Sequence, residues 1–299
     1  MEEPTLHLSS KISNISLFVL SIAISIIVLI GSSESFSHSR VDNDLEFYTV
    51  KKGASFNSIL EELTVKPAHK FLLKVYLRVN DINMAQAGHY HLKNKSWKKF
   101  ILSVNRGDVV IYKLEIPAGK NLFEIKQILS ESNLNNDCSN FKCLDDRYDF
   151  VEGTLKPDTY FYKYSDSLSK ILQRSQDEFF KSSLNLWEKK KPNFPLTTLA
   201  DALILASIVE KEAGNEEEKS IIAGVFLHRL SIGMKLQADP TIIYGLMPDF
   251  NGDITKANLR DKNNPYNTYQ ISALPPTPIS MISQSSLEAV ILGMKNDYL

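Results

Sequence analysis

The sequence has almost no net charge, because 34 lysines and arginines nearly balance 35 aspartates and glutamates. A chain without a basic surplus has no general attraction to nucleic acid, so no nucleic-acid partner is expected. Cysteine is also scarce. Cys138 and Cys143 are the only two, and they lack the second ligand pair that a structural zinc site needs. A disulfide that closes a small loop and a pair of free thiols both remain open.

Histidine does not supply a metal site either. His89 and His91 would share one face of a predicted strand, but no third ligand accompanies them, so no metal is expected. A length of 299 residues allows one or two domains with a sizeable core. The charged and aromatic content argues against bulk disorder.

One long apolar run stands out. Residues 12–31 read ISNISLFVLSIAISIIVLIG without a charge, and twenty helical residues span about 30 Å, the thickness of a bilayer core. The alternative is a cleaved signal peptide, which would have a shorter apolar core and a basic start. We favour an uncleaved anchor, with a cytoplasmic N-terminus at residues 1–11, an exported body and a Ser-rich linker at residues 32–44.

A pattern of strand, glycine turn and helix then occurs twice. Residues 47–63 and 112–129 both show it, with good N-cap residues at Ser55 and Asn121. Between them the sequence predicts a further strand, a helix and another strand. We predict a small α+β module at residues 45–130, in which nothing supplies a catalytic group.

The rest of the chain is predicted to be a second domain, reached through a polar connector at residues 131–149. A helix is expected over residues 165–191, and another opens at Thr198 with Asp201 in capping-box spacing. The second of these helices is apolar almost all round, which predicts a central, buried helix. The expected fold class is therefore α+β: a transmembrane helix, a small module, and a mixed helix and strand domain at residues 150–299.

Two glutamates interrupt this apolar helix near its end. Burying a carboxylate costs several kcal/mol unless it is paired or neutralised. On a helical wheel Glu212 falls on the side of Leu205, and Glu210 falls on nearly the opposite side. One should face a pocket as a general acid of raised pKa, and the other should find a partner such as Arg229, Arg260 or a lysine. The alternative is that both glutamates sit in structural salt bridges.

Several motifs follow one another in a specific order. The sequence contains EGTLKPDTYFY, ASIVEKEAG, VFLHRLSIGMKLQADPTIIYG, YNTY and LPPTPIS. From about residue 45 onward the chain thereby resembles the YceG-like family of membrane-anchored endolytic murein transglycosylases. The predicted module resembles the LysM-like portion of that family. Each motif alone is modest, whereas the ordered set is highly specific.

The resemblance implies a reaction and a catalytic residue. Members of the family cleave the bond between N-acetylmuramic acid (MurNAc) and N-acetylglucosamine (GlcNAc) within nascent glycan strands, which limits chain elongation. The C6 hydroxyl of MurNAc attacks C1 in place of water and leaves a 1,6-anhydro end. One carboxyl group can then serve first as acid and afterwards as base, and the catalytic glutamate aligns with Glu212. No cofactor is implied.

The resemblance also implies residues that bind the sugars. Amide, hydroxyl and aromatic groups supply the hydrogen bonds and apolar faces that a sugar site needs. The alternative for each is a capping or packing role, and Asp239 before Pro240 can simply fix a turn. The substrate-binding candidates are Gln237, Asp239, Tyr244, Asn267, Tyr269 and Asp158, with Tyr160 as a further contributor from the same motif as Asp158.

The sequence departs from the family pattern in two places. Met281 and Ile282 stand where the family has Asn and Pro, and Ala273 and Thr277 stand where it has glycine. Relatives also continue beyond the position of the last residue, so the catalytic domain is expected to be truncated at its C-terminus.

Three functions are compatible with these observations. The leading one is a single-pass protein of the inner (plasma) membrane whose extracytoplasmic domain cuts peptidoglycan glycan strands, with peptidoglycan synthases as expected partners. The second is a non-catalytic glycan-binding or scaffold protein on the same fold. The third is a hydrolase in which Glu212 works with water and a second acid, for which Asp239 and Asp158 are the candidates.

Overall fold

The computed structural model describes residues 6–63, 65–250 and 252–293. The chain divides into two compact units, Met1–Ile111 (unit 1) and Tyr112–Leu299 (unit 2). Each unit has its own hydrophobic core. The secondary structure is mixed α and β, as predicted, with helices forming the larger part.

Unit 1 begins with one long helix, α1 (Leu6–Ser37). Its segment Ser16–Ser37 is long and apolar enough to cross a membrane, a test that a signal sequence also passes. Residues 16–28 are exposed on every side, so no part of the described protein covers their apolar surface. The predicted N-terminal segment, residues 1–11, lies partly outside the described residues.

The predicted linker at residues 32–44 is helical in its first part. Helix α1 runs on to Ser37, and the side chains of Ser33 and Ser37 are buried. Each hydroxyl donates to a carbonyl three residues earlier, at 2.8 and 2.7 Å. Lys98 Nζ also lies 2.6 Å from Glu34 Oε1. The start of this segment is therefore a packed helix end rather than a flexible tether, because its polar groups find partners.

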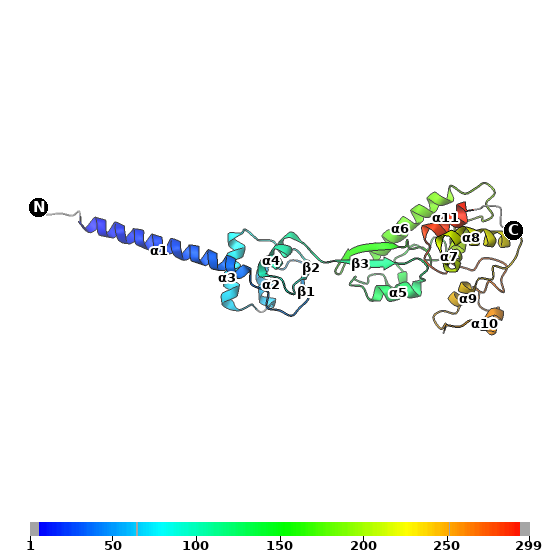
Figure 1. The fold of residues 1–299 in the computed structure, drawn as a ribbon, viewed down its shortest axis with the longest axis horizontal. Helices are drawn as coiled ribbons and strands as arrows, with labels where there is room; N and C mark the ends of the chain where they lie inside the picture. The colour runs from blue at the N-terminus through cyan, green and yellow to red at the C-terminus, as the bar shows by residue number, and fades with distance from the viewer. Residues whose placement is uncertain (1–5, 64, 251, 294–299) are drawn as a thin grey trace. The chain divides into compact units, whose positions relative to one another are not determined.

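The rest of unit 1 is a small α+β body (Figure 1). Strand β1 (Phe47–Val50) pairs antiparallel with β2 (Gly88–His91), with Tyr48 opposite Tyr90. Both tyrosines are buried in the core that the strands share with the helices of this unit. The helices are α2 (Phe56–Glu62), α3 (Pro67–Val79) and α4 (Trp97–Arg106).

The two histidines of β2 pack on an aromatic ring. The rings of His89 and His91 lie 4.9 and 4.7 Å from the ring of Phe47 on the neighbouring strand, measured between centroids. Within the described ranges, no group of three His, Cys, Asp or Glu side chains has the arrangement to hold a metal ion.

Unit 2 opens with a second two-stranded ribbon. Strand β3 (Ile111–Ile116) pairs with β4 (Asp158–Lys163), and α5 (Leu122–Ser130) follows β3 after a glycine turn. The N-caps predicted at Ser55 for α2 and at Asn121 for α5 are confirmed, and both form reciprocal capping boxes. The two repeated patterns therefore begin their helices in the same way.

The two repeats nevertheless belong to different units. The predicted module at residues 45–130 crosses the division after Ile111. The partner of β3 is β4, and Ile125 of α5 shares a core with Leu155 and Tyr160. The second repeat is thus part of unit 2, because its pairing strand and its core contacts come from later residues of that unit.

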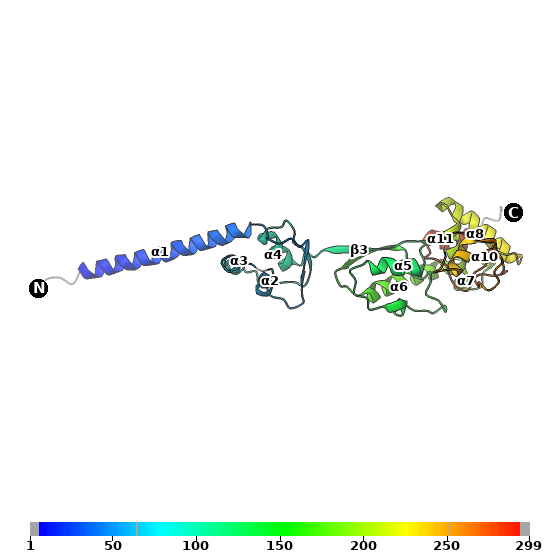
Figure 2. The ribbon, with the colours of Figure 1, turned by 90° about the horizontal axis from the view of Figure 1, so that it is seen from below.

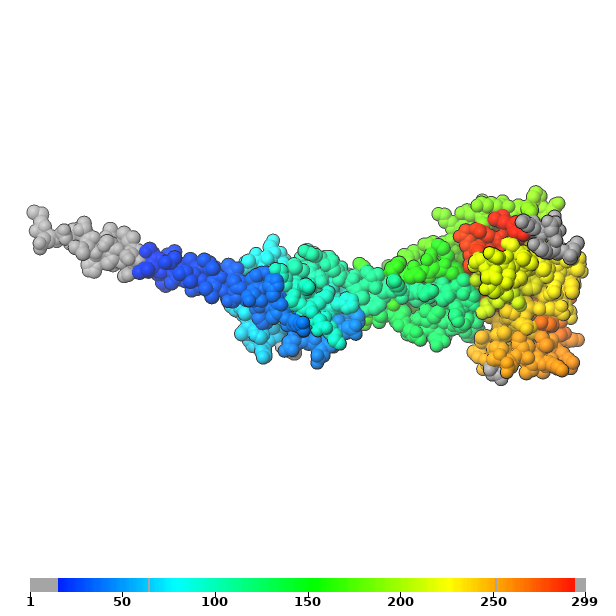
Figure 3. Space-filling model, viewed as in Figure 1, coloured from blue at the N-terminus to red at the C-terminus, as the bar shows by residue number. Residues whose placement is uncertain are grey.

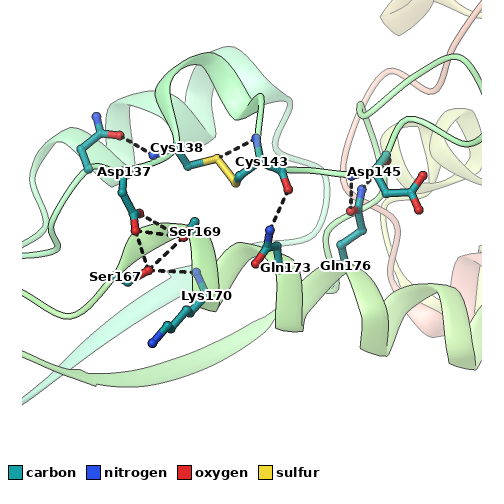
Figure 4. Close-up of a disulfide and its surroundings, with 10 residues drawn as sticks. Asp137, Cys138, Cys143, Asp145, Ser167, Ser169, Lys170, Gln173 and Gln176 are labelled. Carbon is teal, nitrogen blue, oxygen red and sulfur yellow. Dashed lines mark hydrogen bonds between the residues drawn. A yellow bond between two sulfur atoms is a disulfide. The ribbon is translucent and has the colours of Figure 1, made fainter.

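The predicted connector carries a disulfide. Cys138 and Cys143 form a disulfide (Figure 4), and their Cα atoms are 5.3 Å apart. Of the two alternatives from the sequence, the structure therefore has the disulfide and not two free thiols. Asp137 accepts a hydrogen bond of 2.7 Å from Ser167 Oγ, at the start of the following helix. Gln173 Nε2 donates to the Cys143 carbonyl at 3.0 Å. These bonds fasten the connector to that helix.

The remainder of unit 2 gathers around helix α7 (Leu199–Glu212), as Figures 1 and 2 show. Every residue from 202 to 209 is buried, and Thr198 and Asp201 form the predicted capping box. Helix α7 contacts α6, α8, α9 and α11. The other elements of this part are the 3-10 helix η1 (Ser139–Phe141) and the α-helices α6 (Leu168–Trp187), α8 (Glu216–Ser231), α9 (Asp239–Gly245), α10 (Lys256–Arg260) and α11 (Gln284–Leu292).

Because α7 is buried, shortening one of its side chains should destabilise unit 2 more than shortening a side chain on the surface. Leu203 is fully buried, so Leu203→Ala should lower the free energy of unfolding by about 3 kcal/mol through lost burial and a residual cavity. Leu184 on α6 is 43% exposed, so Leu184→Ala is the matched control, with an expected loss of about 0.5 kcal/mol. Urea denaturation measures both, and equal losses would contradict the central position of α7.

Candidate active site

The two glutamates at the end of α7 have different surroundings. Glu210 is held by the start of α11: its Oε2 accepts hydrogen bonds from Ser283 N at 3.0 Å, Ser283 Oγ at 2.5 Å and Ser286 Oγ at 2.6 Å. Lys219 Nζ lies 3.7 Å from the same oxygen, on a side chain that is only 6% exposed. Glu210 is therefore the structural carboxylate, and its cationic partner is a lysine.

Glu212 makes no hydrogen bond or ion pair with any other residue in the described part of the chain, and it lies exposed at the end of α7. Although the residue is exposed, nearby groups remove enough water from its carboxyl to raise the pKa, and the negative charge of Asp239 raises it further. A carboxyl group of raised pKa keeps its proton to a higher pH. Such a group is suited to general acid catalysis.

Asp239 and Tyr269 form a pair beside Glu212. Tyr269 Oη donates to Asp239 Oδ1 at 2.7 Å. This hydrogen bond is the main reason that the pKa of Tyr269 rises to about 12, and the charge of Glu212 adds to the rise while that of Arg229 opposes it. The electrostatic influence of Glu212 on Tyr269, and of Asp239 on Glu212, places these groups in one neighbourhood. The structure thus brings together three of the predicted site residues.

The chain before Asp239 has an unusual backbone. Gln237 has φ of +55°, in the left-handed region that non-glycine residues rarely adopt. Hydrogen bonds on both sides impose it: Arg229 donates to the Leu236 carbonyl, and Ala238 N donates to Thr268 Oγ1 at 2.9 Å. The Gln237 side chain is exposed. Strain held in this way is common where a binding or catalytic group must be positioned.

The segment around α9 and α10 forms a lobe next to the surface of α8, visible in orange and yellow in Figure 3. Asn267 lies inside this lobe with no exposed surface. Its Nδ2 donates to the carbonyls of Asn258 and Asp261 at 3.0 and 2.7 Å, and its Oδ1 accepts from Tyr269 N at 3.1 Å. The prediction that Asn267 touches substrate is therefore not supported. Its amide is used to hold the loop that carries Tyr269.

Asp158 and Tyr160 also have local partners. Asp158 is exposed at the start of β4, with Lys156 Nζ at 3.4 Å and a hydrogen bond of 2.8 Å from Thr159 N. Tyr160 is buried, and its hydroxyl donates to the Lys156 carbonyl at 2.9 Å. Within the described ranges, no hydrogen bond or ion pair links either residue to Glu212. These partners are local, so the predicted contact of Asp158 and Tyr160 with substrate stays a prediction.

Tyr244 forms a hydrogen bond with a carboxylate that is not among the site candidates from the sequence. Its hydroxyl donates to Glu152 Oε2 at 2.9 Å. Glu152 is 4% exposed and also accepts from Leu122 N at 3.0 Å and Gly153 N at 3.2 Å. Burial is the main cause that raises the pKa of Glu152 to about 7. Tyr244 thus bonds a buried group that links α9 to the N-terminus of α5.

Glu152 belongs to the EGTLKPDTYFY motif, in which only Asp158 and Tyr160 are candidates from the sequence. The available signal is a lone glutamate beside a glycine, between the apolar residues Phe150, Val151 and Leu155. Only the fold shows that the surroundings of this glutamate exclude water.

Comparison with known proteins identifies the family of this chain. A sequence model of the YceG-like family matches residues 48–299. The chain belongs to the YceG-like family. This confirms the family that the ordered motifs predicted.

Curated relatives carry one description. The endolytic murein transglycosylase of Bacillus subtilis (strain 168) is 35% identical over 156 residues, which are 50% of this chain and 41% of that protein. The endolytic murein transglycosylase of Streptococcus pneumoniae (strain R6) is 27% identical over 273 residues, 77% of this chain and 49% of that protein. The chain therefore spans about half the length of the curated relatives it matches.

A solved structure is also similar. The crystal structure of a YceG-like protein from Listeria monocytogenes matches with a TM-score of 0.51 and 27% sequence identity, over 85% of this chain and 91% of that one.

The departures from the YceG-like pattern are accommodated by packing. Met281 and Ile282 are both buried, and Met281 exchanges two backbone hydrogen bonds with the 119–120 turn, at 2.8 and 2.7 Å. The Thr277 hydroxyl lies 2.8 Å from Tyr266 Oη. The side chains of Met281 and Ile282 therefore fill the core, and the Thr277 hydroxyl pairs with a neighbour, which a glycine at that position could not do.

One concave pocket of unit 2 has a volume of about 240 Å³ and is bordered by residues of α5 and its two flanks, including Lys120 and Glu131, and not by Glu212. Glu212 itself is exposed. An open site suits a long polymer better than a small molecule, which usually binds in an enclosing cavity.

The charge of Asp239 predicts a shift in the Glu212 pKa. Replacing Asp239 by Asn removes that charge but keeps an acceptor for Tyr269, so the pKa of Glu212 should fall. NMR titration of the Glu212 carboxyl carbon measures the shift. Asp177→Asn, on an exposed position of α6, is the control and should leave this pKa unchanged. If the pKa of Glu212 is the same in wild type and in Asp239→Asn, the proximity of Asp239 to Glu212 is contradicted.

The buried Glu152 predicts a pH dependence of stability. Its pKa is raised from 4.5 to about 7, so the folded state binds more protons than the unfolded state between these values. The free energy of unfolding should therefore fall as pH rises through this window, by about 3 kcal/mol from this group. Glutamine at position 152 cannot ionise, so Glu152→Gln should not lose this stability. The free energy of unfolding of the variant should therefore rise relative to that of wild type, by about this amount, as the pH goes from about 5 to about 8. Urea denaturation across this range measures the difference, and a constant gap would refute the assignment.

Proposed function

We propose that this chain is an endolytic peptidoglycan lytic transglycosylase. It would cut MurNAc–GlcNAc bonds within nascent glycan strands, leave 1,6-anhydro-MurNAc ends and so limit strand elongation. Family membership and the endolytic murein transglycosylases among its relatives support this activity. The single observation that carries the proposal is Glu212: an exposed carboxyl of raised pKa, without a partner in the described chain, beside the Asp239–Tyr269 pair.

The proposed reaction uses one carboxyl group twice. Protonated Glu212 gives its proton to the glycosidic oxygen, the bond from that oxygen to C1 breaks, and GlcNAc leaves as an alcohol. The Glu212 carboxylate then takes the proton of the MurNAc C6 hydroxyl as that oxygen bonds to C1. The proton balance closes without water, and no cofactor is required.

The neighbours of Glu212 have separate roles in this scheme. The negative charge of Asp239 keeps the Glu212 proton in place before the reaction and stabilises the positive charge that develops at C1. Tyr269 holds Asp239 through its hydrogen bond. The exposed amide of Gln237 is available to the hydroxyl and acetamide groups of the sugars.

One observation favours a second candidate, which is hydrolysis by the same site. Asp239 is a second carboxylate close enough to raise the pKa of Glu212, and a pair of carboxylates is what most glycosidases use to activate water or to attack C1. The product distinguishes the two reactions, because hydrolysis leaves a reducing end and the transglycosylase an anhydro end.

We also propose that the protein is a single-pass protein of the inner (plasma) membrane, with α1 as anchor and both units outside the cytoplasm. The uncovered apolar residues of α1 support the anchor, and the disulfide in unit 2 suits an oxidising compartment. Unit 1 would be a LysM-like module, α7 the central helix of a catalytic domain, and peptidoglycan synthases the partners that deliver nascent strands.

Digestion of purified peptidoglycan, followed by mass spectrometry of the products, tests the activity. Wild type should release fragments with 1,6-anhydro-MurNAc ends. Glu212→Gln cannot donate a proton and should lose about 100-fold or more of the rate. Glu210→Gln is the matched control two residues away, and it should keep most of the activity because the glutamine oxygen can still accept the hydrogen bonds of Ser283 and Ser286 that hold the end of α7.

Each other outcome points to a different conclusion. Reducing ends would support the hydrolase. Glycan binding without cleavage would support a scaffold protein. Loss of activity in Glu210→Gln but not in Glu212→Gln would overturn the site.

A further inference from the structure

Helix α3 has an outward face that its own unit leaves uncovered. Its buried residues include Leu73 and Tyr76, which lie in the core of unit 1. The opposite side of the helix carries Phe71, which is 55% exposed, and the exposed side chains of Lys74 and Arg78. Their spacing of three and four residues places the ring and the two cations on one stripe.

The stripe lies on a helix that packs against α1. Helix α3 packs against α1, and the ring of His69 lies 4.4 Å from that of Phe36, between centroids. Figures 1 and 2 show α3 lying across α1, at the side of unit 1 from which the rest of α1 projects. The contact falls just after the uncovered apolar residues 16–28. Helix α3 therefore lies beside α1 near the point where the apolar segment ends.

The cations of the stripe are available for a ligand. Lys70, on the flank of α3, is occupied by Glu61 at 2.5 Å. Lys74 and Arg78 form no side-chain hydrogen bond or ion pair with another residue of the described ranges, although the charge of Lys74 also acts on Glu61. A large apolar ring flanked by cations on a helix that lies beside a membrane span is the pattern of an interfacial helix.

We propose that α3 binds the membrane surface, with Phe71 at the boundary between headgroups and acyl chains and with Lys74 and Arg78 on the phosphates of anionic phospholipids. This inference rests on the proposal that α1 spans the membrane. A helix that crosses the bilayer leaves the attached domain free to tilt and rotate about one point. A second attachment through α3 fixes the orientation of unit 1 on the surface.

Depth-dependent quenching of a tryptophan reporter tests the contact. The full-length protein carrying Phe71→Trp is reconstituted into vesicles of phosphatidylcholine and phosphatidylglycerol, with bromine on the acyl chains near the headgroup. The bromines should quench the new tryptophan. Phe161→Trp in unit 2 is the matched control, because Phe161 is 60% exposed, and its tryptophan should not be quenched. Trp97 and Trp187 give the same background in both variants.

The charge contribution is tested in the same reporter protein. Lys74→Gln with Arg78→Gln should lower the ratio of bound to unbound α3 about 25-fold, since each cation near an anionic surface contributes about fivefold. Quenching should fall accordingly. Raising the salt concentration, or using vesicles of phosphatidylcholine alone, should also reduce quenching of the reporter protein that keeps Lys74 and Arg78.

Flotation of the vesicles separates the two proposals. Protein that does not float with the vesicles refutes the membrane span of α1. Protein that floats, but whose Phe71→Trp reporter is quenched no more than the Phe161→Trp control, refutes the α3 contact alone, including the case in which the stripe binds a protein instead. Quenching that is indifferent to the two glutamine substitutions would refute the role of the cations.

Discussion

The hydrogen bonds between Glu210 and the first residues of α11 fix the end of α7. A carboxylate placed this deep costs several kcal/mol unless its lone pairs and its charge are satisfied. Ser283 and Ser286 supply donors, and Lys219, itself buried, supplies the opposite charge. The last turn of α7 is therefore held in one orientation. Because successive helical residues rotate by about 100°, that orientation turns Glu212 to the other side, toward solvent.

The surroundings of Glu212 are organised from a separate part of the chain. Asp239 and Tyr269 lie on two segments that are fastened together by their own hydrogen bond and through Thr268, and the buried Asn267 holds the loop that carries Tyr269. The left-handed backbone of Gln237 is held between the same bonds. Buried polar networks of this kind are costly unless fully satisfied, and when satisfied they leave few alternative arrangements. The candidate site thus has a rigid support beneath an open surface, which suits a chemical step that needs close positioning of a polymer.

Glu152 links this support to the N-terminus of α5. It receives hydrogen bonds from the N-terminus of α5 and from Tyr244 of α9, so one buried carboxyl joins the start of unit 2 to the lobe that carries Asp239. Its raised pKa reflects the lack of water around it. The connector with its disulfide is likewise bonded to α6. Unit 2 is therefore assembled by polar contacts between distant segments as well as by its apolar core.

Features that depend on neighbouring residues could be predicted from the sequence. Capping boxes, the apolar span of α1, the divergence of Glu210 from Glu212 and the family motifs all follow from local spacing and from order along the chain. Features that depend on contacts between distant segments became apparent only in the fold. It assigned the second repeat to unit 2, buried Asn267, and enclosed Glu152. The physical reason is that burial and charge depend on which segments meet, and a single sequence records spacing along the chain but not proximity in space.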